Sequence, residues 1–238
     1  MSQTAQQIVS LACSIARVPG YLSQGGQFLN MVLDELCQTY DLEQALTTTT
    51  IALTTSVGAG PYTMPTDYLR ARRDGVTYYI NGTAYGPVSI SIEEYNRLPQ
   101  QSGLQNYPEL FAVDLSPVAN QLPPIMYVWP PAGGAYTLFV RYYRQMPQIT
   151  APETSTAIPW FSNQNYLVTR LAGELMKLAD DDRSSKFLGE GPEGAQGILN
   201  RFLKLQSDDE GRAKQVTLDE RFFRRGNYHA KNTKLIGW

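Results

Sequence analysis

The hydrophobic period of this chain changes twice, and that change most restricts the possible folds. Near both ends, apolar residues recur every three or four positions, which is the period of an amphipathic helix. Between Thr47 and about Pro147 this period is replaced by Thr-rich and Tyr-rich runs typical of strands. Because amphipathic helices need partners to bury their apolar stripes, we expect the two helical ends to pack together. The sequence therefore predicts an α+β fold: a four-helix bundle with an inserted antiparallel β domain and an extended C-terminal tail.

Two helices are predicted before residue 47. Thr4 and Gln7 have the spacing of a capping box at the start of the first helix, and Pro19-Gly20 marks its end. The second helix is expected to start near Ser23. Because only a short turn joins them, the two helices should form an antiparallel hairpin.

The middle segment carries the signals of strands and tight turns. Asn81-Gly82 separates two strand-like runs and is the preferred turn of a two-residue hairpin. Val88 to Ile92 is a further predicted strand, followed by a short helical turn. Ile125 to Trp129 and Ala135 to Arg144 are predicted to form a second hairpin, because only Pro130 to Gly134 separates them.

The last predicted strand carries apolar groups on both of its faces. Side chains alternate along a strand, so one face receives Tyr136, Leu138, Val140 and Tyr142, and the other receives Thr137, Phe139, Arg141 and Tyr143. A strand of this kind is normally covered on both sides. We therefore expect the second face to be covered by protein, either within the chain or from a neighbouring subunit.

Two more helices are predicted after the β segment. Ser162 is expected to cap the third, whose stripe is Leu167, Leu171, Leu175 and Leu178. Pro192 suits the first turn of the fourth, which Gly211 should close. The predicted domains are therefore 1–46 and 151–211 for the two halves of the bundle, 47–150 for the β domain and 212–238 for a C-terminal tail.

Charge is distributed unevenly, although the net charge is only −2. Residues 212–238 contain seven Lys and Arg against two Asp and Glu, a balance of +5, so the remainder carries −7. A basic tail on an acidic body is typical of a partner-binding segment, although a solvated, disordered tail has the same composition. Charged residues make up 18% of the chain, and 15 Tyr accompany them, which favours surfaces covered by partners.

Several classes of protein and site are disfavoured by what the sequence lacks. No apolar run is long enough to cross a membrane, and the N-terminus lacks the basic start of a signal peptide. The two cysteines, Cys13 and Cys37, fall at apolar helix positions and are expected to be buried free thiols in a reducing compartment. We predict no membrane partner and no disulfide.

No catalytic, cofactor or metal site is predicted. The single histidine, His229, lies in the tail, where no rigid scaffold would orient it for catalysis. The acidic runs Asp180-Asp181-Asp182 and Glu93-Glu94 lack the ligand spacing of a calcium loop or the separation of a glycosidase pair. The glycines at Gly58 and Gly60 lack the lysine of a phosphate-binding loop. The chain is predicted not to be an enzyme.

Several strings of residues, in their order along the chain, resemble one family. They are Gly60-Pro61-Tyr62-Thr63-Met64-Pro65-Thr66-Asp67-Tyr68-Leu69-Arg70, Tyr127-Val128-Trp129-Pro130-Pro131, Arg141-Tyr142-Tyr143-Arg144-Gln145-Met146-Pro147, and Pro159-Trp160-Phe161 followed by Tyr166 to Leu178. With this organisation the chain resembles the head-to-tail adaptor, also called the tail tubular or gatekeeper-type connector protein, of short-tailed, podovirus-like bacteriophages. The resemblance covers nearly the whole chain, and its weight lies in the succession of elements.

The resemblance implies a structural virion protein. Such adaptors assemble in the host cytoplasm as a ring, generally of twelve copies, between the dodecameric portal and the tail nozzle in the neck of the virion. DNA passes through the ring without sequence-specific contacts during genome ejection. The tail of an adaptor typically reaches the portal, and the family brings no catalytic residue, cofactor or metal.

The tail supplies the candidate site residues. A segment that binds a partner needs large apolar anchors and charges that steer it. The candidates for portal binding are Arg221, Phe222, Phe223, Arg224, Arg225, Tyr228 and Trp238.

Two alternative functions remain open from the residues. One is a carbohydrate-binding module of a phage tail component, built on the aromatic residues Tyr78, Tyr79, Trp129 and Tyr136. The other is a hydrolase that uses carboxylates.

Overall fold

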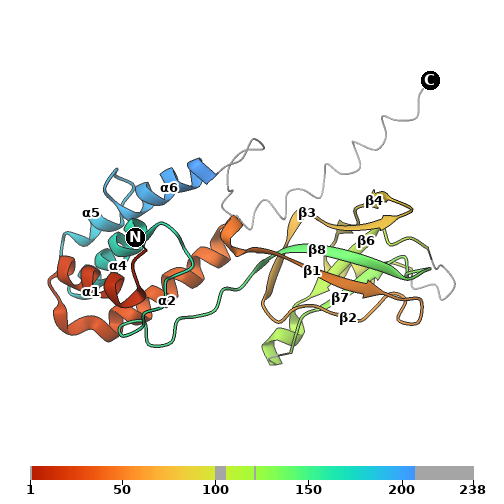
Figure 1. The fold of residues 1–238 in the computed structure, drawn as a ribbon, viewed down its shortest axis with the longest axis horizontal. Helices are drawn as coiled ribbons and strands as arrows, with labels where there is room; N and C mark the ends of the chain where they lie inside the picture. The colour runs from red at the N-terminus through yellow and green to blue at the C-terminus, as the bar shows by residue number, and fades with distance from the viewer. Residues whose placement is uncertain (1, 100–105, 121, 207–238) are drawn as a thin grey trace, which may run out of the picture. The chain divides into compact units, whose positions relative to one another are not determined.

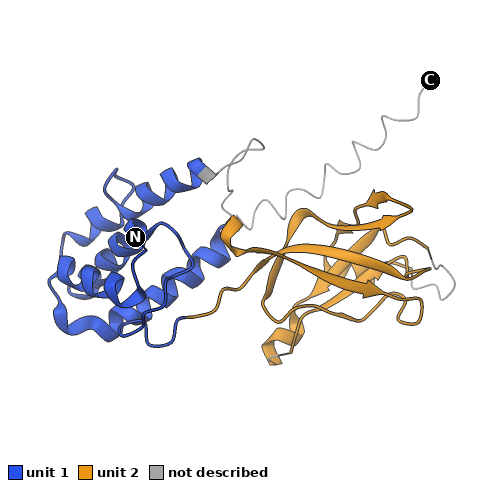
Figure 2. Cartoon of the chain, in the orientation of Figure 1, with its two compact units in different colours: residues 1–41, 149–238 blue, residues 42–148 orange. Residues whose placement is uncertain are grey.

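The structure is a computed structural model, and it describes residues 2–99, 106–120 and 122–206. The chain forms two compact units (Figure 1, Figure 2). The first contains the described residues up to Asp41 and those from Ile149 onward, and the second is the continuous segment Leu42–Gln148. The chain thus leaves the first unit once, forms the second and returns.

Helices make up the first unit, and strands make up most of the second. The helices of the first unit are α1 (Ala5–Ala16), η1 (Pro19–Tyr21), α2 (Leu22–Thr39), α4 (Gln164–Leu178), α5 (Ser184–Leu188) and α6 (Ala195–Gln206). The second unit contains η2 (Glu43–Ala45), β1 (Leu46–Leu53), β2 (Tyr62–Thr63), β3 (Tyr68–Ile80), β4 (Thr83–Tyr85), β5 (Val88–Ser89), α3 (Ile92–Asn96), β6 (Leu110–Asp114), η3 (Ser116–Asn120), β7 (Ile125–Trp129) and β8 (Tyr136–Arg144). The predicted α+β class is confirmed.

Helix α4 is the centre of the helical unit. It packs against α1, α2, α5 and α6, and it is buried on several sides, through Tyr166, Leu167, Val168, Leu171, Ala172, Leu175 and Met176. A helix that is apolar on several sides belongs in the interior of a helical domain. The structure does not confirm a four-helix bundle, because the other helices surround α4 and the short α5, which was not predicted, packs on it.

The returning chain closes this unit at two places. The amide N–H groups of Ala5 and Gln6, which have no partners inside α1, donate to the carbonyls of Ala157 (2.8 Å) and Ser155 (3.1 Å). Asn30 of α2 exchanges two hydrogen bonds with the backbone of Ile149, each 3.0 Å long. The segment that follows the β unit is therefore part of the helical fold.

The helix ends show which boundaries local sequence signals predict correctly. The capping box of Thr4 and Gln7 is confirmed, with bonds of 3.3 and 3.0 Å. Helix α1 ends at Ala16, before the predicted Pro19, because Arg17 adopts the left-handed conformation. The predicted cap Ser162 was wrong by one residue: the side chain of Asn163 accepts from the amide of Tyr166 at 3.0 Å.

The helical stripes are buried in part. Leu167, Leu171 and Leu175 are fully buried, whereas Leu178, predicted to join them, is 52% exposed in the last turn of α4. Both cysteines are free and buried, as predicted. Gly211, the predicted end of the fourth helix, lies outside the described residues.

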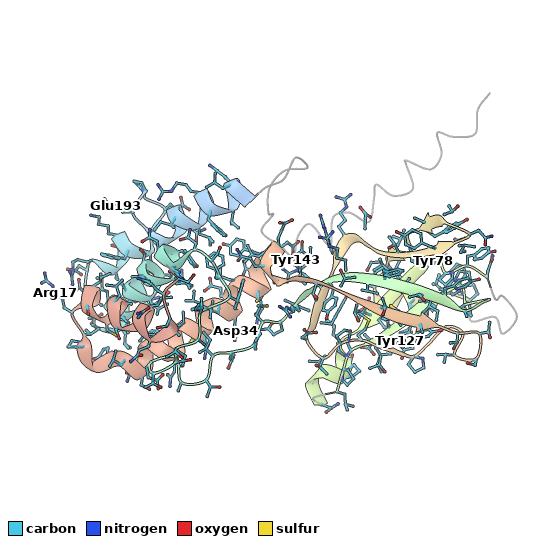
Figure 3. All side chains as sticks on the ribbon, viewed as in Figure 1. Arg17, Asp34, Tyr78, Tyr127, Tyr143 and Glu193 are labelled. Carbon is cyan, nitrogen blue, oxygen red and sulfur yellow. The ribbon has the colours of Figure 1, made fainter. Side chains whose placement is uncertain are left out.

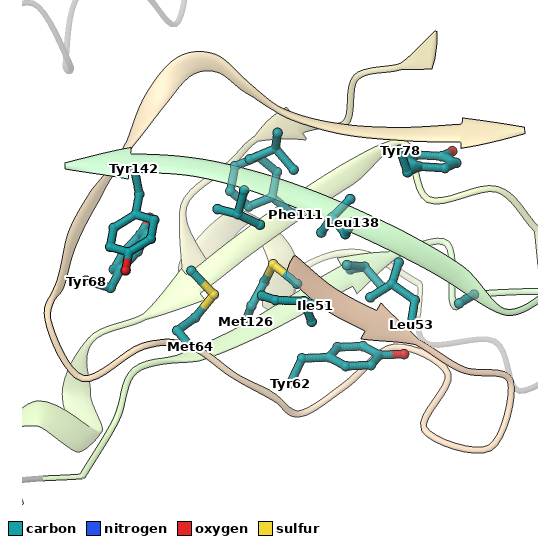
Figure 4. Packing of buried hydrophobic residues seen from close by; sticks show 14 residues of the cluster. Ile51, Leu53, Tyr62, Met64, Tyr68, Tyr78, Phe111, Met126, Leu138 and Tyr142 are labelled. Carbon is teal, nitrogen blue, oxygen red and sulfur yellow. The ribbon is translucent and has the colours of Figure 1, made fainter. Parts of the chain in front are cut away.

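Two four-stranded sheets form the second unit. Their strand orders are β1-β8-β3-β4 and β2-β7-β6-β5, and side chains of both meet in one core (Figure 4). The first sheet contributes Ile51, Leu53, Tyr68, Val76, Tyr78, Leu138, Val140 and Tyr142, and the second contributes Tyr62, Phe111, Met126 and Val128. This arrangement is a β-sandwich, in which each sheet keeps one face outside the core.

One predicted hairpin is correct and the other is wrong. Asn81 and Gly82 have positive φ angles of 49° and 82° and join β3 to β4, as a primed turn requires. Strands β7 and β8 belong to different sheets: β7 pairs with β2 and β6, whereas β8 pairs with β1 and β3. The six residues between β7 and β8 carry the chain across the sandwich rather than around a hairpin.

The β unit also differs from prediction at one edge. The predicted strand Val88 to Ile92 is reduced to β5, which ends at Ser89, because Ser91 caps α3. Strand β5 pairs in parallel with β6, so the second sheet is mixed, whereas the first is wholly antiparallel as predicted.

Candidate interaction surfaces

The outer face of the first sheet exposes aromatic side chains. Strand β8 buries Leu138, Val140 and Tyr142 in the core, so alternation places Phe139 and Arg141 on the other face. Phe139 is 38% exposed and meets Tyr79 of β3, which is 57% exposed, edge to face with ring centroids 6.0 Å apart. The predicted division of this strand into two faces is therefore confirmed, and in this chain the outer face remains open at Phe139.

Arginines lie along β3 and β8, the two strands that carry this aromatic pair. Arg70 of β3 lies opposite Tyr143 and places its guanidinium 5.1 Å from the centre of that ring. Between the pairs Ala71–Tyr142 and Val76–Val140, four residues of β3 lie opposite the single residue Arg141. The four are Arg72, Arg73, Asp74 and Gly75, a bulge that gathers basic residues beside Arg141.

Glycine is required in this bulge. A Cβ atom on Gly75 would lie 2.7 Å from the carbonyl oxygen of Arg141 and 3.0 Å from that of Arg72. Backbone atoms cannot move away at low cost, so only glycine allows β3 to approach β8 this closely. The bulge, and with it the position of the arginines, depends on this residue.

The outer face of the second sheet is covered. Tyr95 of α3 packs on Tyr127 of β7 (labelled in Figure 3), with ring centroids 5.2 Å apart. The indole N–H of Trp129 donates to the carbonyl of Pro99 at 3.3 Å. Since Met126 and Val128 alternate with these residues and face the core, α3 lies on the face opposite the core. The two sheets therefore differ: one outer face is covered within the unit, and the other is open at its aromatic pair.

A shallow groove of about 620 Å³ lies at the end of β8. It is lined by Thr66, Asp67, Arg144, Gln145, Met146, Pro147 and Gln148. Beside it, the hydroxyl of Tyr142 donates to Asp67 at 2.9 Å, and burial together with this bond raises the pKa of Tyr142 to about 12. This phenol stays protonated at neutral pH, so the contact is a structural hydrogen bond rather than an acid–base pair.

The aromatic residues do not form the platform that a carbohydrate-binding module requires. Tyr78 is 1% exposed, its hydroxyl donates to Pro108 at 2.9 Å, and burial raises its pKa to about 12. Its ring lies in a closed set of four with Tyr85, Tyr107 and Tyr136, whose rings contact one another. Tyr79 lies on the opposite face of β3, and Trp129 lies in the other sheet. The four residues proposed for sugar binding are thus not coplanar in one groove.

The acidic runs have structural partners. Asp181 accepts from the guanidinium of Arg183 at 2.6 and 3.0 Å, and these bonds lower its pKa to about 2. Glu94 accepts from the backbone N–H of Ser91 at 3.1 Å in the capping box of α3. Within residues 2–99, 106–120 and 122–206, no group of three His, Cys, Asp or Glu side chains is placed to hold a metal ion.

The predicted portal-binding residues are not among those described. Arg221, Phe222, Phe223, Arg224, Arg225, Tyr228 and Trp238 all lie outside the described residues, as does His229. The structure instead adds the outer face of the first sheet, whose Phe139 and Arg141 the alternation of β8 had already separated from the core. The bulge arginines Arg72 and Arg73 were missed, because their position depends on the pairing register of β3.

In the described part of the chain, no helix has both the length and the apolar character to cross a membrane.

Comparison with known proteins identifies the family. No curated protein matches the chain. The model of the family described as SU10 adaptor protein matches residues 4–217, which include both compact units. The chain therefore belongs to the SU10 adaptor protein family and is a phage head–tail adaptor, as its resemblance to connector proteins implied.

Proposed function

We propose that this chain is a non-catalytic structural subunit that forms the ring joining the portal to the tail nozzle. The family match across residues 4–217 carries this proposal, because it spans both units in one continuous alignment. In the assembled neck of the virion, about twelve copies would enclose the channel through which DNA passes, as the resemblance to connector proteins implies. This role requires surfaces for partners rather than a reactive centre.

The C-terminal tail is the proposed portal-binding segment. Residues 212–238 carry a balance of +5 and four large aromatic anchors, namely Phe222, Phe223, Tyr228 and Trp238. Arginines increase the rate of encounter with an acidic surface, and buried aromatic side chains prolong the complex. The composition of this segment thus supports a contact with a large, acidic protein partner such as the portal.

The acidity of the remaining chain supports its proposed place around the DNA channel. The chain without residues 212–238 has a formal charge of −7. Phosphate contacts from a basic wall would retain DNA, and each one strengthens non-specific binding. An acidic body is compatible with DNA that must move through the ring.

Removal of the tail tests the proposed portal contact. A variant that ends at Gly211 should keep the circular dichroism spectrum of the full chain in its helical and strand regions but fail to bind purified portal. Phe222→Ser with Phe223→Ser should increase the dissociation rate, whereas Arg224→Gln with Arg225→Gln should mainly slow association at low salt. Unchanged binding of the truncated protein would remove the tail from the portal contact.

A further inference from the structure

We propose that the β unit joins neighbouring copies head to tail, with the basic outer face of the first sheet on one copy docking against the acidic outer side of the second sheet on the next. The proposal rests on the proposed ring and specifies the two surfaces that form it. Its occupant is a second copy of this chain. Charge complementarity between the two sides of one sandwich is the observation that carries it.

The basic face contains arginine and no lysine. The segment Leu42–Gln148 has six basic residues, all arginine, and five of them belong to β3 or β8. Four of the five, Arg70, Arg72, Arg73 and Arg141, lie along β3 and β8 on one side of the exposed pair of Phe139 and Tyr79, and Asp74 is the one acid among them, so this patch has a net charge of +3. Arginine and aromatic residues are enriched in protein interfaces, whereas lysine is depleted.

The acidic side lies across the sandwich. Helix α3, which covers the second sheet, carries Glu93 and Glu94, and Asp114 ends β6 on the same outer face. Arg97 follows the helix, so this side has a net charge of −2. Backbone N–H groups hold both carboxylates in place: Glu94 accepts from Ser91 at 3.1 Å, and Asp114 accepts from Ser116 at 2.8 Å.

Apolar surface accompanies the acids. Leu115 and Val118, which follow Asp114, are both exposed. They supply the apolar area that the aromatic pair on the basic face would contact. Exposed apolar residues thus accompany the arginines in space and follow Asp114 in the chain, and the signs of the two charges are opposite.

Opposite faces of a sandwich point in opposite directions, and this geometry determines the kind of assembly. A contact between two different patches is heterologous, so each copy keeps one free patch of each kind and can bind two neighbours. Such a contact closes into a ring when the rotation between copies allows it. A face-to-face dimer would instead bring +3 against +3, which is repulsive.

Two charge-reversed variants of the full chain test the proposal. The first, Arg73→Glu with Arg141→Glu, changes the basic patch from +3 to −1. The second, Glu93→Arg with Asp114→Arg, changes the acidic patch from −2 to +2. Each is mixed with portal, and the number of copies bound per portal ring is measured by mass photometry and electron microscopy. Each variant alone should need at least about tenfold more protein than the unaltered chain to complete the ring.

The mixture of the two variants is the decisive measurement. In the first variant the altered basic face carries −1 and the acidic side −2. In the second variant the basic face carries +3 and the altered acidic side +2. Two copies of the same variant therefore repel each other, whereas copies of different variants attract. An equimolar mixture should therefore restore complete rings at a concentration within about threefold of the unaltered chain. Restoration also shows that both variants are folded. Complete rings from either variant alone, or none from the mixture, would overturn the assignment of the two faces.

Arg97→Glu is the matched control. It makes the same chemical change as Arg141→Glu but on the acidic side, so ring completion should be unchanged or easier. If the reversal at Arg73 and Arg141 leaves ring formation intact and weakens binding to a double-stranded DNA fragment, the basic face contacts DNA and the proposal fails. If the unaltered chain binds no portal at all, the proposed function fails, and the inference fails with it.

Discussion

At the scale of single residues, Asn30 connects α2 to the chain returning from the β unit. Its amide donates to the carbonyl of Ile149 and accepts from the amide of the same residue, both at 3.0 Å. Asn30→Ala removes both bonds at a half-buried site and should lower the free energy of unfolding by about 1–3 kcal/mol. Urea denaturation followed by circular dichroism measures the change.

Two further substitutions serve as comparisons for the stability change of Asn30→Ala. Asn30→Asp keeps an acceptor for the Ile149 amide but loses the donor to its carbonyl, so it should also destabilise. Asn200→Ala removes an exposed amide contact with Gln196 (3.2 Å) inside α6 and should change the stability by less than about 0.5 kcal/mol. Equal effects at Asn30 and Asn200 would show that the contact with Ile149 adds nothing.

Asp181 is the residue whose charge depends most clearly on one partner. Its bonds to Arg183 lower the pKa from 3.8 to about 2 in the folded protein. A lowered folded-state pKa means that the contact stabilises the protein above about pH 4 and is lost as the pH falls from about 4 to about 2. Arg183→Gln should raise the pKa of Asp181 towards 3.8, as followed by NMR titration of its carboxyl carbon.

The stability of the same variant should follow that titration. The unaltered chain should exceed Arg183→Gln in stability at pH 6, and the difference should disappear near pH 2. Lys186→Gln, which removes a more exposed ion pair with Glu193, should leave the pKa of Asp181 unchanged. A pKa of Asp181 that stays near 2 in Arg183→Gln would exclude the guanidinium as the cause.

At the scale of elements, the bulge of β3 cannot admit one added methyl group without a shift of the backbone. A Cβ atom on Gly75 would lie 2.7 Å from the carbonyl oxygen of Arg141. Gly75→Ala should therefore destabilise the protein by about 1–3 kcal/mol, since backbone must shift to admit the methyl group. Gly86→Ala, where the nearest atom is 3.6 Å away, should stay within about 0.5 kcal/mol, and thermal unfolding distinguishes the two.

Elements whose signals are local were predictable from the sequence, and those that depend on strand pairing were not. The capping box of Thr4 and the turn at Asn81-Gly82 each involve residues within three positions, and both are present. The hairpin expected between β7 and β8 was wrong, because proximity along the chain favours a hairpin unless distant strands offer better partners. Here β1 and β3, both far from β8 in the sequence, take its two edges.

At the scale of the whole molecule, the sequence predicted the second face of β8, expected to be covered by protein, but not the residues that lie beside it. Alternation along β8 separates Phe139 and Arg141 from Leu138 and Val140 in any sheet that buries one face. The arginines of the β3 bulge come beside Arg141 only through the register of the two strands. A patch formed by two strands cannot be predicted from the periodicity of either strand alone.

The continuity of the β unit leads to a prediction about folding. Its 14-residue buried cluster comes entirely from within Leu42–Gln148, whereas the helical unit is built from two separate segments. A fragment of residues 42–148 should therefore fold alone and unfold cooperatively on heating, with a strand-type circular dichroism spectrum.

The helical unit should behave differently, since α4 is surrounded by helices from both segments. Residues 1–41 and residues 149–238 should each remain largely unfolded alone, because isolated short helices bury too little surface to be stable. Mixed together, they should gain helical signal beyond the sum of the separate spectra. Cooperative unfolding of either helical fragment alone, or a disordered 42–148 fragment, would show that the two units do not hold the separate cores described above.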